Sequence, residues 1–167
     1  MKTLIASLLM LFVVVIPGFT QENQEHYAIM TIALEAKGES LLGQIAVGEV
    51  IRNRIKAELN DCLDCIGAGL SYDTAFRQTI DNVIFKKWQF SCWNNAVTYR
   101  ERDNLQQFVS AKEYQKASQA WSESEFSNLT KGATMYYNPK KVKNPNWNFK
   151  VLQYTATLQN HKFYKEV

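Results

Sequence analysis

Two glutamates stand four residues apart, at positions 35 and 39, where the apolar periodicity is interrupted by Lys37 and Gly38. Glu35 follows a mostly apolar run, so its carboxyl is expected to lie against apolar side chains, where loss of water raises its pKa. Glu39 would lie one helical turn further if the helix continued through Gly38, and its charge would add to the effect. Such a carboxyl can protonate an ether-like oxygen, as a general acid does in glycosidic cleavage. Acids at helix ends are ordinarily solvated, so the pair alone leaves both interpretations open.

The few cysteines and histidines limit the metal and disulfide chemistry that the chain could support. The spacing of Cys62 and Cys65 could supply half of a zinc site, but a full site needs about four ligands, and only His26 and His161 remain as imidazoles. We therefore expect no metal and no cofactor. A disulfide between two of the three cysteines, which include Cys92, is favoured, and the sequence leaves the pairing open.

Helical spacing of apolar residues defines the elements that must position Glu35. The first predicted helix covers 26–36 and ends at Gly38, and the second covers 41–59 with Ser40 as its N-cap. Two further helices are expected over 71–85 and 110–121.

The pattern of apolar residues changes beyond Lys131, from helical spacing to alternation. The stretches GATMYYN and KVLQYTATLQ carry alternating and β-branched residues, with Pro139, Pro145 and asparagine-rich turns between them, which predicts a small antiparallel sheet. Helices followed by strands indicate an α+β fold rather than a βαβ sheet. The length favours a single domain over 25–167.

The N-terminus has the three parts of a secretory signal peptide. Lys2 precedes an apolar run over 4–16, and Pro17 and Gly18 follow it. The run is short for a membrane span, which needs roughly 17 to 25 residues, so we expect export, cleavage near residue 20 and no stable span. The predicted location is secreted, in the periplasm or the cell wall.

The charge of the chain excludes one class of partner. The formal net charge is +3, and no lysine or arginine cluster accompanies it beyond Lys140, Lys141 and Lys143. A nucleic-acid partner is therefore not expected. Aromatic residues make up 13% of the chain, which is more than one small core usually hides, so some should line a surface groove.

Four stretches occur in a fixed order: EAKGESLLGQIAVGEVIRNRI, KKWQFSCWNN, GATMYYNPKKVKNPNW and LQNHKFYKEV. In this order they resemble the motifs of the bacterial cell wall hydrolases of the spore-cortex-lytic type, over residues 27–164. The resemblance implies a lysozyme-like, two-lobed fold. It also implies cleavage of the glycan strand of peptidoglycan between N-acetylmuramic acid and N-acetylglucosamine.

The resemblance assigns the catalytic acid to the first glutamate of the motif, here Glu35. These enzymes resemble lytic transglycosylases, in which a single glutamate protonates the leaving oxygen. As a base it then helps the sugar's own hydroxyl to close an anhydro ring. If water were the acceptor instead, a second carboxylate about 5 to 9.5 Å away would be expected, and Glu39 or Glu49 would be the candidate.

Substrate contacts are expected from the same motifs. Gln89, Phe90 and Ser91 offer an amide, a ring and a hydroxyl suited to N-acetyl groups and pyranose faces, or else they pack in the core beside Cys92. Only one of Tyr136 and its neighbour should face the groove, because side chains alternate along a strand. The complete predicted set of substrate-binding residues is Glu39, Gln44, Gln89, Phe90, Ser91, Tyr137, Trp147 and His161.

Three classes of function remain open. The first is a secreted glycosidase or lytic transglycosylase that acts on peptidoglycan strands, with wall-associated protein partners unspecified. The second is an N-acetylmuramoyl-L-alanine amidase or other wall hydrolase, which should need a metal triad for which few ligands exist. The third is a catalytically silent wall-binding protein, against which the presence of Glu35 argues.

Arg54 is expected to pair with an acid in a structural role.

Overall fold

The computed structural model describes residues 22–61 and 72–167. The predicted signal peptide, Cys62 and Cys65 lie outside these ranges. The α-helices are α1 (Glu22–Glu35), α2 (Leu41–Asp61), α4 (Tyr72–Phe85), α5 (Tyr99–Asn104) and α6 (Ala111–Glu123). The 3₁₀ helices are η1 (Ser91–Trp93), η2 (Leu105–Phe108) and η3 (Phe149–Val151), and the strands are β1 (Met135–Tyr137), β2 (Leu152–Leu158) and β3 (His161–Glu166). The described chain is therefore α+β, as predicted.

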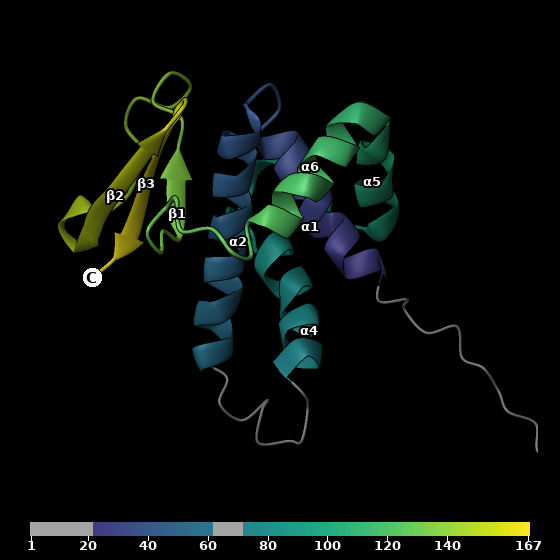
Figure 1. Cartoon of the computed structure of the whole chain (residues 1–167), viewed down its shortest axis with the longest axis horizontal. Helices are drawn as coiled ribbons and strands as arrows, with labels where there is room; N and C mark the ends of the chain where they lie inside the picture. The colour runs from purple at the N-terminus through teal and green to yellow at the C-terminus, as the bar shows by residue number, and fades with distance from the viewer. Residues whose placement is uncertain (1–21, 62–71) are drawn as a thin grey trace, which may run out of the picture.

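Helix α2 stands between the other helices and the sheet (Figure 1). On one side, Val47, Ile51 and Ile55 belong to the large core that α2 forms with the helices around it. On the other side, Ala46 and Val50 pack against Phe163 of β3 in a second, smaller core. Because α2 is apolar on two faces, it separates a helical part of the molecule from a β part.

The turn between α1 and α2 places Glu35 at the last residue of a helix. Gly38 has a φ of 82°, a left-handed conformation that glycine adopts without steric cost, and it ends the helical path. The Ser40 hydroxyl then accepts a hydrogen bond from Gly43 N at 3.4 Å, which confirms the predicted N-cap. Glu39 consequently does not lie one helical turn beyond Glu35.

The sheet has three antiparallel strands in the order β1-β3-β2. Tyr136 pairs with Phe163 across β1 and β3, and both side chains lie on the face that packs toward α2. Tyr137 and Tyr164 therefore lie on the opposite, outer face, because side chains alternate along a strand. The first two strands were predicted, whereas β3 was not.

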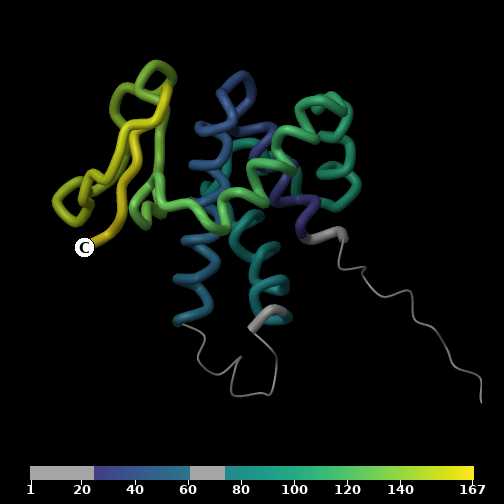
Figure 2. Tube along the Cα trace, viewed as in Figure 1, coloured from purple at the N-terminus to yellow at the C-terminus, as the bar shows by residue number. Residues whose placement is uncertain are grey.

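The segment that links α6 to β1 crosses α2, as the tube in Figure 2 shows. Glu49 of α2 holds this segment from beneath with a buried carboxylate. The carboxylate accepts hydrogen bonds from the backbone N–H groups of Leu129 and Thr130 at 2.7 and 2.8 Å, from the Thr130 hydroxyl at 2.6 Å, and from the Ser127 hydroxyl. This network satisfies a buried charge and fixes the approach of the chain to the sheet.

None of the helices in the described ranges is both long and apolar enough to cross a membrane.

Candidate active site

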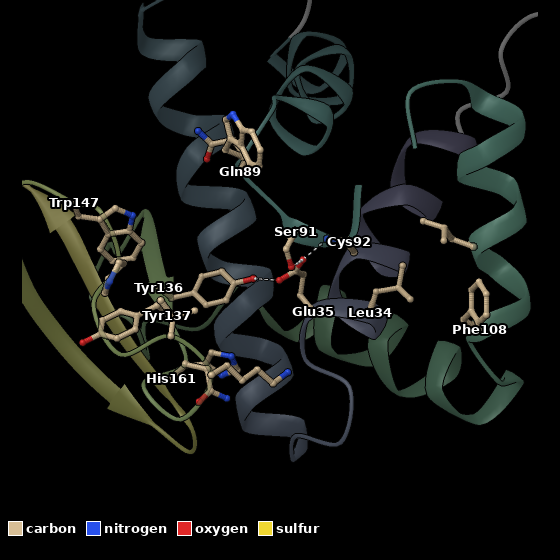
Figure 3. Close-up of a pocket in the computed structure, with 16 residues that line it drawn as sticks. Leu34, Glu35, Gln89, Ser91, Cys92, Phe108, Tyr136, Tyr137, Trp147 and His161 are labelled. Carbon is tan, nitrogen blue, oxygen red and sulfur yellow. Dashed lines mark hydrogen bonds between the residues drawn. The ribbon is translucent and has the colours of Figure 1, made fainter. Parts of the chain in front are cut away.

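A cavity of about 540 Å³ lies beside the C-terminal end of α1. Leu34 and Phe108 line it on the helical side, and Tyr137 and Trp147 line it on the β side (Figure 3). Leu105 of η2 also lines the cavity. Glu35 lies between these two walls. The volume of the cavity is in the range of ligand-binding clefts.

Three donors converge on the Glu35 carboxylate. Oε1 accepts hydrogen bonds from the Ser91 hydroxyl at 2.8 Å and from the backbone N–H of Cys92 at 2.7 Å. Oε2 accepts a longer bond, 3.3 Å, from the Tyr136 hydroxyl (Figure 3). The carboxyl is therefore held in one orientation at the edge of the cavity.

The short helix η1 is fixed against α1, and this places Ser91 and Cys92 beside the glutamate. Trp93 is buried in the helical core, and its indole N–H donates to the Thr31 hydroxyl at 2.8 Å. Thr31 lies one helical turn before Glu35 in α1. The contact between Trp93 and Thr31 thus holds η1, which carries the donors Ser91 and Cys92, against α1, which carries the acceptor Glu35.

Arg54 of α2 connects the two segments that carry Tyr136 and Ser91. Its guanidinium donates to Thr134 O at 2.5 Å and to Gln89 O at 3.0 Å, and it lies over the Phe90 ring with 4.6 Å to the ring centroid. Burial lowers the pKa of Arg54 to about 10, so it keeps its charge at neutral pH. Arg54 was predicted to pair with an acid in a structural role. Its role is structural, but backbone carbonyl oxygens, and not a carboxylate, accept its hydrogen bonds.

Tyr136 keeps its proton in this setting. Burial, followed by the neighbouring Glu35 charge, raises the pKa of its hydroxyl well above the usual value. Its ring stacks on Phe163, with 5.8 Å between centroids, and meets the His161 ring edge-on at 5.3 Å. Tyr136 is therefore a fixed hydrogen-bond donor to Glu35.

Cys92 carries a free thiol, so the predicted disulfide does not involve this residue. A bond between Cys62 and Cys65 stays a prediction, because both lie outside the described ranges. Burial, together with the Glu35 charge, raises the pKa of the Cys92 thiol. A protonated thiol is a poor nucleophile, so cysteine-based acyl transfer is not favoured at this site.

The structure brings five of the predicted binding residues to the cavity: Gln89, Ser91, Tyr137, Trp147 and His161. His161 is buried behind Tyr136, and burial lowers the pKa of its imidazole despite the nearby Glu39 carboxylate. Alternation predicted that only one of Tyr136 and Tyr137 faces the groove, and Tyr137 was placed in the predicted set. Both line the cavity, and Tyr136 is the one that donates a hydrogen bond to Glu35. The inner face of β1 is the face directed at the end of α1, which the sequence did not reveal.

Three other predicted residues lie away from the cavity. Phe90 is 1% exposed and packs in the core under Arg54. The Gln44 side chain is buried and donates to Ala36 O at 3.5 Å, and the Glu39 carboxylate is buried and accepts from Asn160 at 2.9 Å. None of the three lines the cavity at which substrate contact was predicted. Phe90 packs under Arg54, whereas Glu39 and Gln44 follow the turn at Gly38, which ends the helical path of α1.

Several residues outside the predicted binding set also line the cavity. Trp88, whose side chain is 75% exposed, adopts a φ of 69° after α4 and lies at the cavity wall. Lys141 and Asn138 contribute polar groups from the loop after β1. Trp88 stands in the aromatic stretch KKWQFSCWNN, and this stretch was the sign of it in the sequence. Two other tryptophans, Trp93 and Trp121, are buried.

In the ranges that the structure describes, no group of three or more histidine, cysteine, aspartate or glutamate side chains is arranged to hold a metal ion. A family model described as cell wall hydrolase matches residues 38–164, well over half of the chain. The chain belongs to the cell wall hydrolase family. The matched region begins three residues after Glu35 and contains the partners that bond to it, Ser91, Cys92 and Tyr136.

Membership in the family makes this cell wall hydrolase an enzyme that degrades peptidoglycan, and its place of action is the wall. No curated protein and no solved structure matches the chain.

Proposed function

We propose that this cell wall hydrolase cleaves the glycosidic bond between N-acetylmuramic acid and N-acetylglucosamine, with Glu35 as general acid and then base. The observation that carries the proposal is the position of this carboxyl at the edge of a cavity lined with tryptophan and tyrosine rings. Such rings stack on the apolar faces of pyranoses, and a proton donor beside them can reach a bridging oxygen. We also infer the lysozyme-like, two-lobed arrangement, with the helical part and the β part as its lobes.

A lytic transglycosylase mechanism is favoured over hydrolysis. Among the described residues that line the cavity, Glu35 is the only carboxylate. Hydrolysis of either stereochemistry ordinarily uses two carboxyl groups, whereas ring closure by the sugar's own hydroxyl needs one. The alternatives predicted for a second acid are engaged elsewhere, because Glu39 bonds to Asn160 and Glu49 holds the segment before β1.

In the proposed reaction, the Glu35 carboxyl gives its proton to the bridging oxygen as the bond from that oxygen to C1 of the muramic ring breaks. The hydroxyl at C6 of the same ring then forms a bond to C1 and returns its proton to the carboxylate. Ser91 and Tyr136 hold the carboxylate in place during both transfers. The product is a 1,6-anhydro ring, and no water is consumed.

Residues around Glu35 are proposed to bind the sugars. Trp88 and Trp147 stand at the cavity wall as stacking platforms, and Gln89 offers an amide for an N-acetyl group. Tyr137 lies beside Trp147, with 5.5 Å between ring centroids. The protein is proposed to reach the wall by means of the predicted leader at residues 1–20.

The first test is clearing of purified peptidoglycan by the Glu35→Gln variant. Glutamine keeps the shape of the side chain and cannot donate the proton, so we expect a loss of activity of about a hundredfold or more. Glu123→Gln, which changes a glutamate at the exposed end of α6, is the matched control and should remain active. Full clearing by Glu35→Gln would refute the proposed role.

The two other classes of function give different results in the same assay. An amidase would release free stem peptides and leave the glycan strands at their original length. A silent wall-binding protein would bind the peptidoglycan without clearing it, whether or not Glu35 is present. Either result would overturn the glycosidase proposal.

A further inference from the structure

Five aromatic rings form a continuous surface on the outer side of the sheet, which we call the aromatic face: Tyr137, Trp147, Phe149, Tyr154 and Tyr164. Tyr164 is at its centre, with ring centroids at 5.5 to 6.0 Å from those of the four others. Tyr154 and Phe149 are 53% and 43% exposed. Exposed aromatic surface of this kind indicates a binding site.

The aromatic face is continuous with the cavity. Tyr137 and Trp147 line the cavity and also contact other rings of the face. The other three rings do not line the cavity. A polymer that leaves the cavity past Trp147 therefore meets a further row of rings on the same sheet.

The β part of the molecule is strongly basic. Residues 131–167 contain seven lysines and one glutamate, a formal charge of +6, so the remaining residues sum to −3 of the total of +3. None of these seven lysines forms an ion pair with a carboxylate in the parts of the chain that the structure describes. Lys150 is exposed and follows Phe149, and Lys162 pairs across the strands with Tyr137. Positive charge is thus available around the rings.

We propose that the aromatic face, with Lys150 and Lys162, binds the part of an anionic glycan strand that extends beyond the cavity. The occupant is a peptidoglycan strand whose stem peptides carry free carboxylates, so the inference rests on the proposed function. Rings stack on pyranose faces, while ammonium groups attract the carboxylates along the strand. Three of the five rings are tyrosines, whose hydroxyls suit a hydrated polysaccharide better than the apolar interior of a membrane.

The test is co-sedimentation with insoluble peptidoglycan sacculi, in a Glu35→Gln background so that the polymer stays intact. The face variant combines Tyr154→Ser, Lys150→Gln and Lys162→Gln, all outside the cavity lining. We expect it to bind sacculi about tenfold more weakly or worse, with a smaller salt dependence. Amidation of the carboxylates of the sacculi should likewise weaken their binding to the protein with the unmodified aromatic face.

Two controls separate binding from folding. The matched surface variant combines Phe126→Ser, Lys56→Gln and Lys112→Gln, which are exposed residues of the helical part, and it should bind as the parent does. A Lys150→Arg, Lys162→Arg variant keeps the charge and should keep the affinity. With active Glu35, the face variant should turn over a short soluble glycan at the parental kcat and lose activity only on sacculi.

Unchanged binding of sacculi by the face variant would overturn the proposal. So would an equal loss of activity on the short soluble glycan, because the face would then be part of the cavity. If the face variant kept its binding to sacculi but lost binding to anionic lipid vesicles, the aromatic face would be assigned to a membrane. If it instead lost self-association, the face would be assigned to a second copy of the chain. Failure of the Glu35 mechanism would show in the products of cleavage and would leave this binding measurement intact.

Discussion

The hydroxyl of Tyr136 is the most informative single group beside Glu35. Its bond to Oε2 is the longest of the three, and its raised pKa keeps it a donor. When the glutamate gives up its proton, this donor stabilises the charge that forms. Hydrogen bonds to charged groups contribute about 1.5 to 3 kcal/mol, so its loss should slow the reaction.

We predict that Tyr136→Phe lowers kcat on a soluble glycan by about tenfold to a hundredfold, with little change in thermal stability. The ring that stacks on Phe163 and His161 is retained, so packing is preserved. Tyr154→Phe removes a surface hydroxyl that bonds to Thr157 and serves as the control. A parental kcat for Tyr136→Phe would show that its hydroxyl takes no part.

The two histidines give the stability of the protein a pH dependence. Burial lowers the pKa of His161 and of His26 from 6.5, so the unfolded chain binds these protons more readily than the native state. Stability should therefore fall as the pH falls below about 6.5.

The measurement is the midpoint of urea unfolding between about pH 7.5 and pH 5. His161→Gln should make the decline shallower, because one group that takes up a proton on unfolding has been removed. His26→Gln is expected to act in the same direction. An unchanged slope in both variants would contradict the linkage.

At the scale of elements, helix α2 organises the site. It supplies Arg54 to the backbone of both cavity walls and Glu49 to the segment before β1. Loss of a buried acceptor that serves four donors is costly, since the donors cannot find water.

Glu49→Gln should lower the free energy of unfolding by about 2 to 4 kcal/mol, because the amide nitrogen faces groups that need an acceptor. Thermal denaturation of the folded variant measures the loss. Glu58→Gln, a partly exposed glutamate further along α2, is the comparison and should change stability by less than about 0.5 kcal/mol. If Glu49→Gln also changed stability by less than about 0.5 kcal/mol, the hydrogen bonds from Glu49 to the segment before β1 would contribute little to stability.

The sequence predicted the four longer helices and the α+β order because their signals are local, whereas the six-residue helix α5 was not predicted. Apolar spacing placed α2, and Ser40 marked its start. Strand β3 was missed because Phe163 gains its burial from packing on Ala46 and Val50 of α2, a contact far away in the sequence. The same reason explains Tyr136, since alternation shows that neighbours face opposite ways but not which face meets α1.

At the scale of the whole molecule, an acidic helical part and a basic β part meet at one cavity. The helical core fixes Glu35 and η1 through Thr31 and Trp93, and the sheet brings the aromatic rings opposite them. This arrangement places the proton donor on one part and the proposed sugar platforms on the other. The cavity therefore depends on α2 and on the crossing segment, which hold the two parts together.

In the proposed reaction, the Glu35 carboxyl alone moves the proton that breaks the glycan strand. Mass spectrometry of muropeptides released from purified peptidoglycan tests it most directly, with the wild-type protein and Glu35→Gln digested side by side. We expect 1,6-anhydromuramic ends to accumulate with the wild-type protein and to be absent with Glu35→Gln. Reducing ends from the wild-type protein, or anhydro ends from Glu35→Gln, would contradict it.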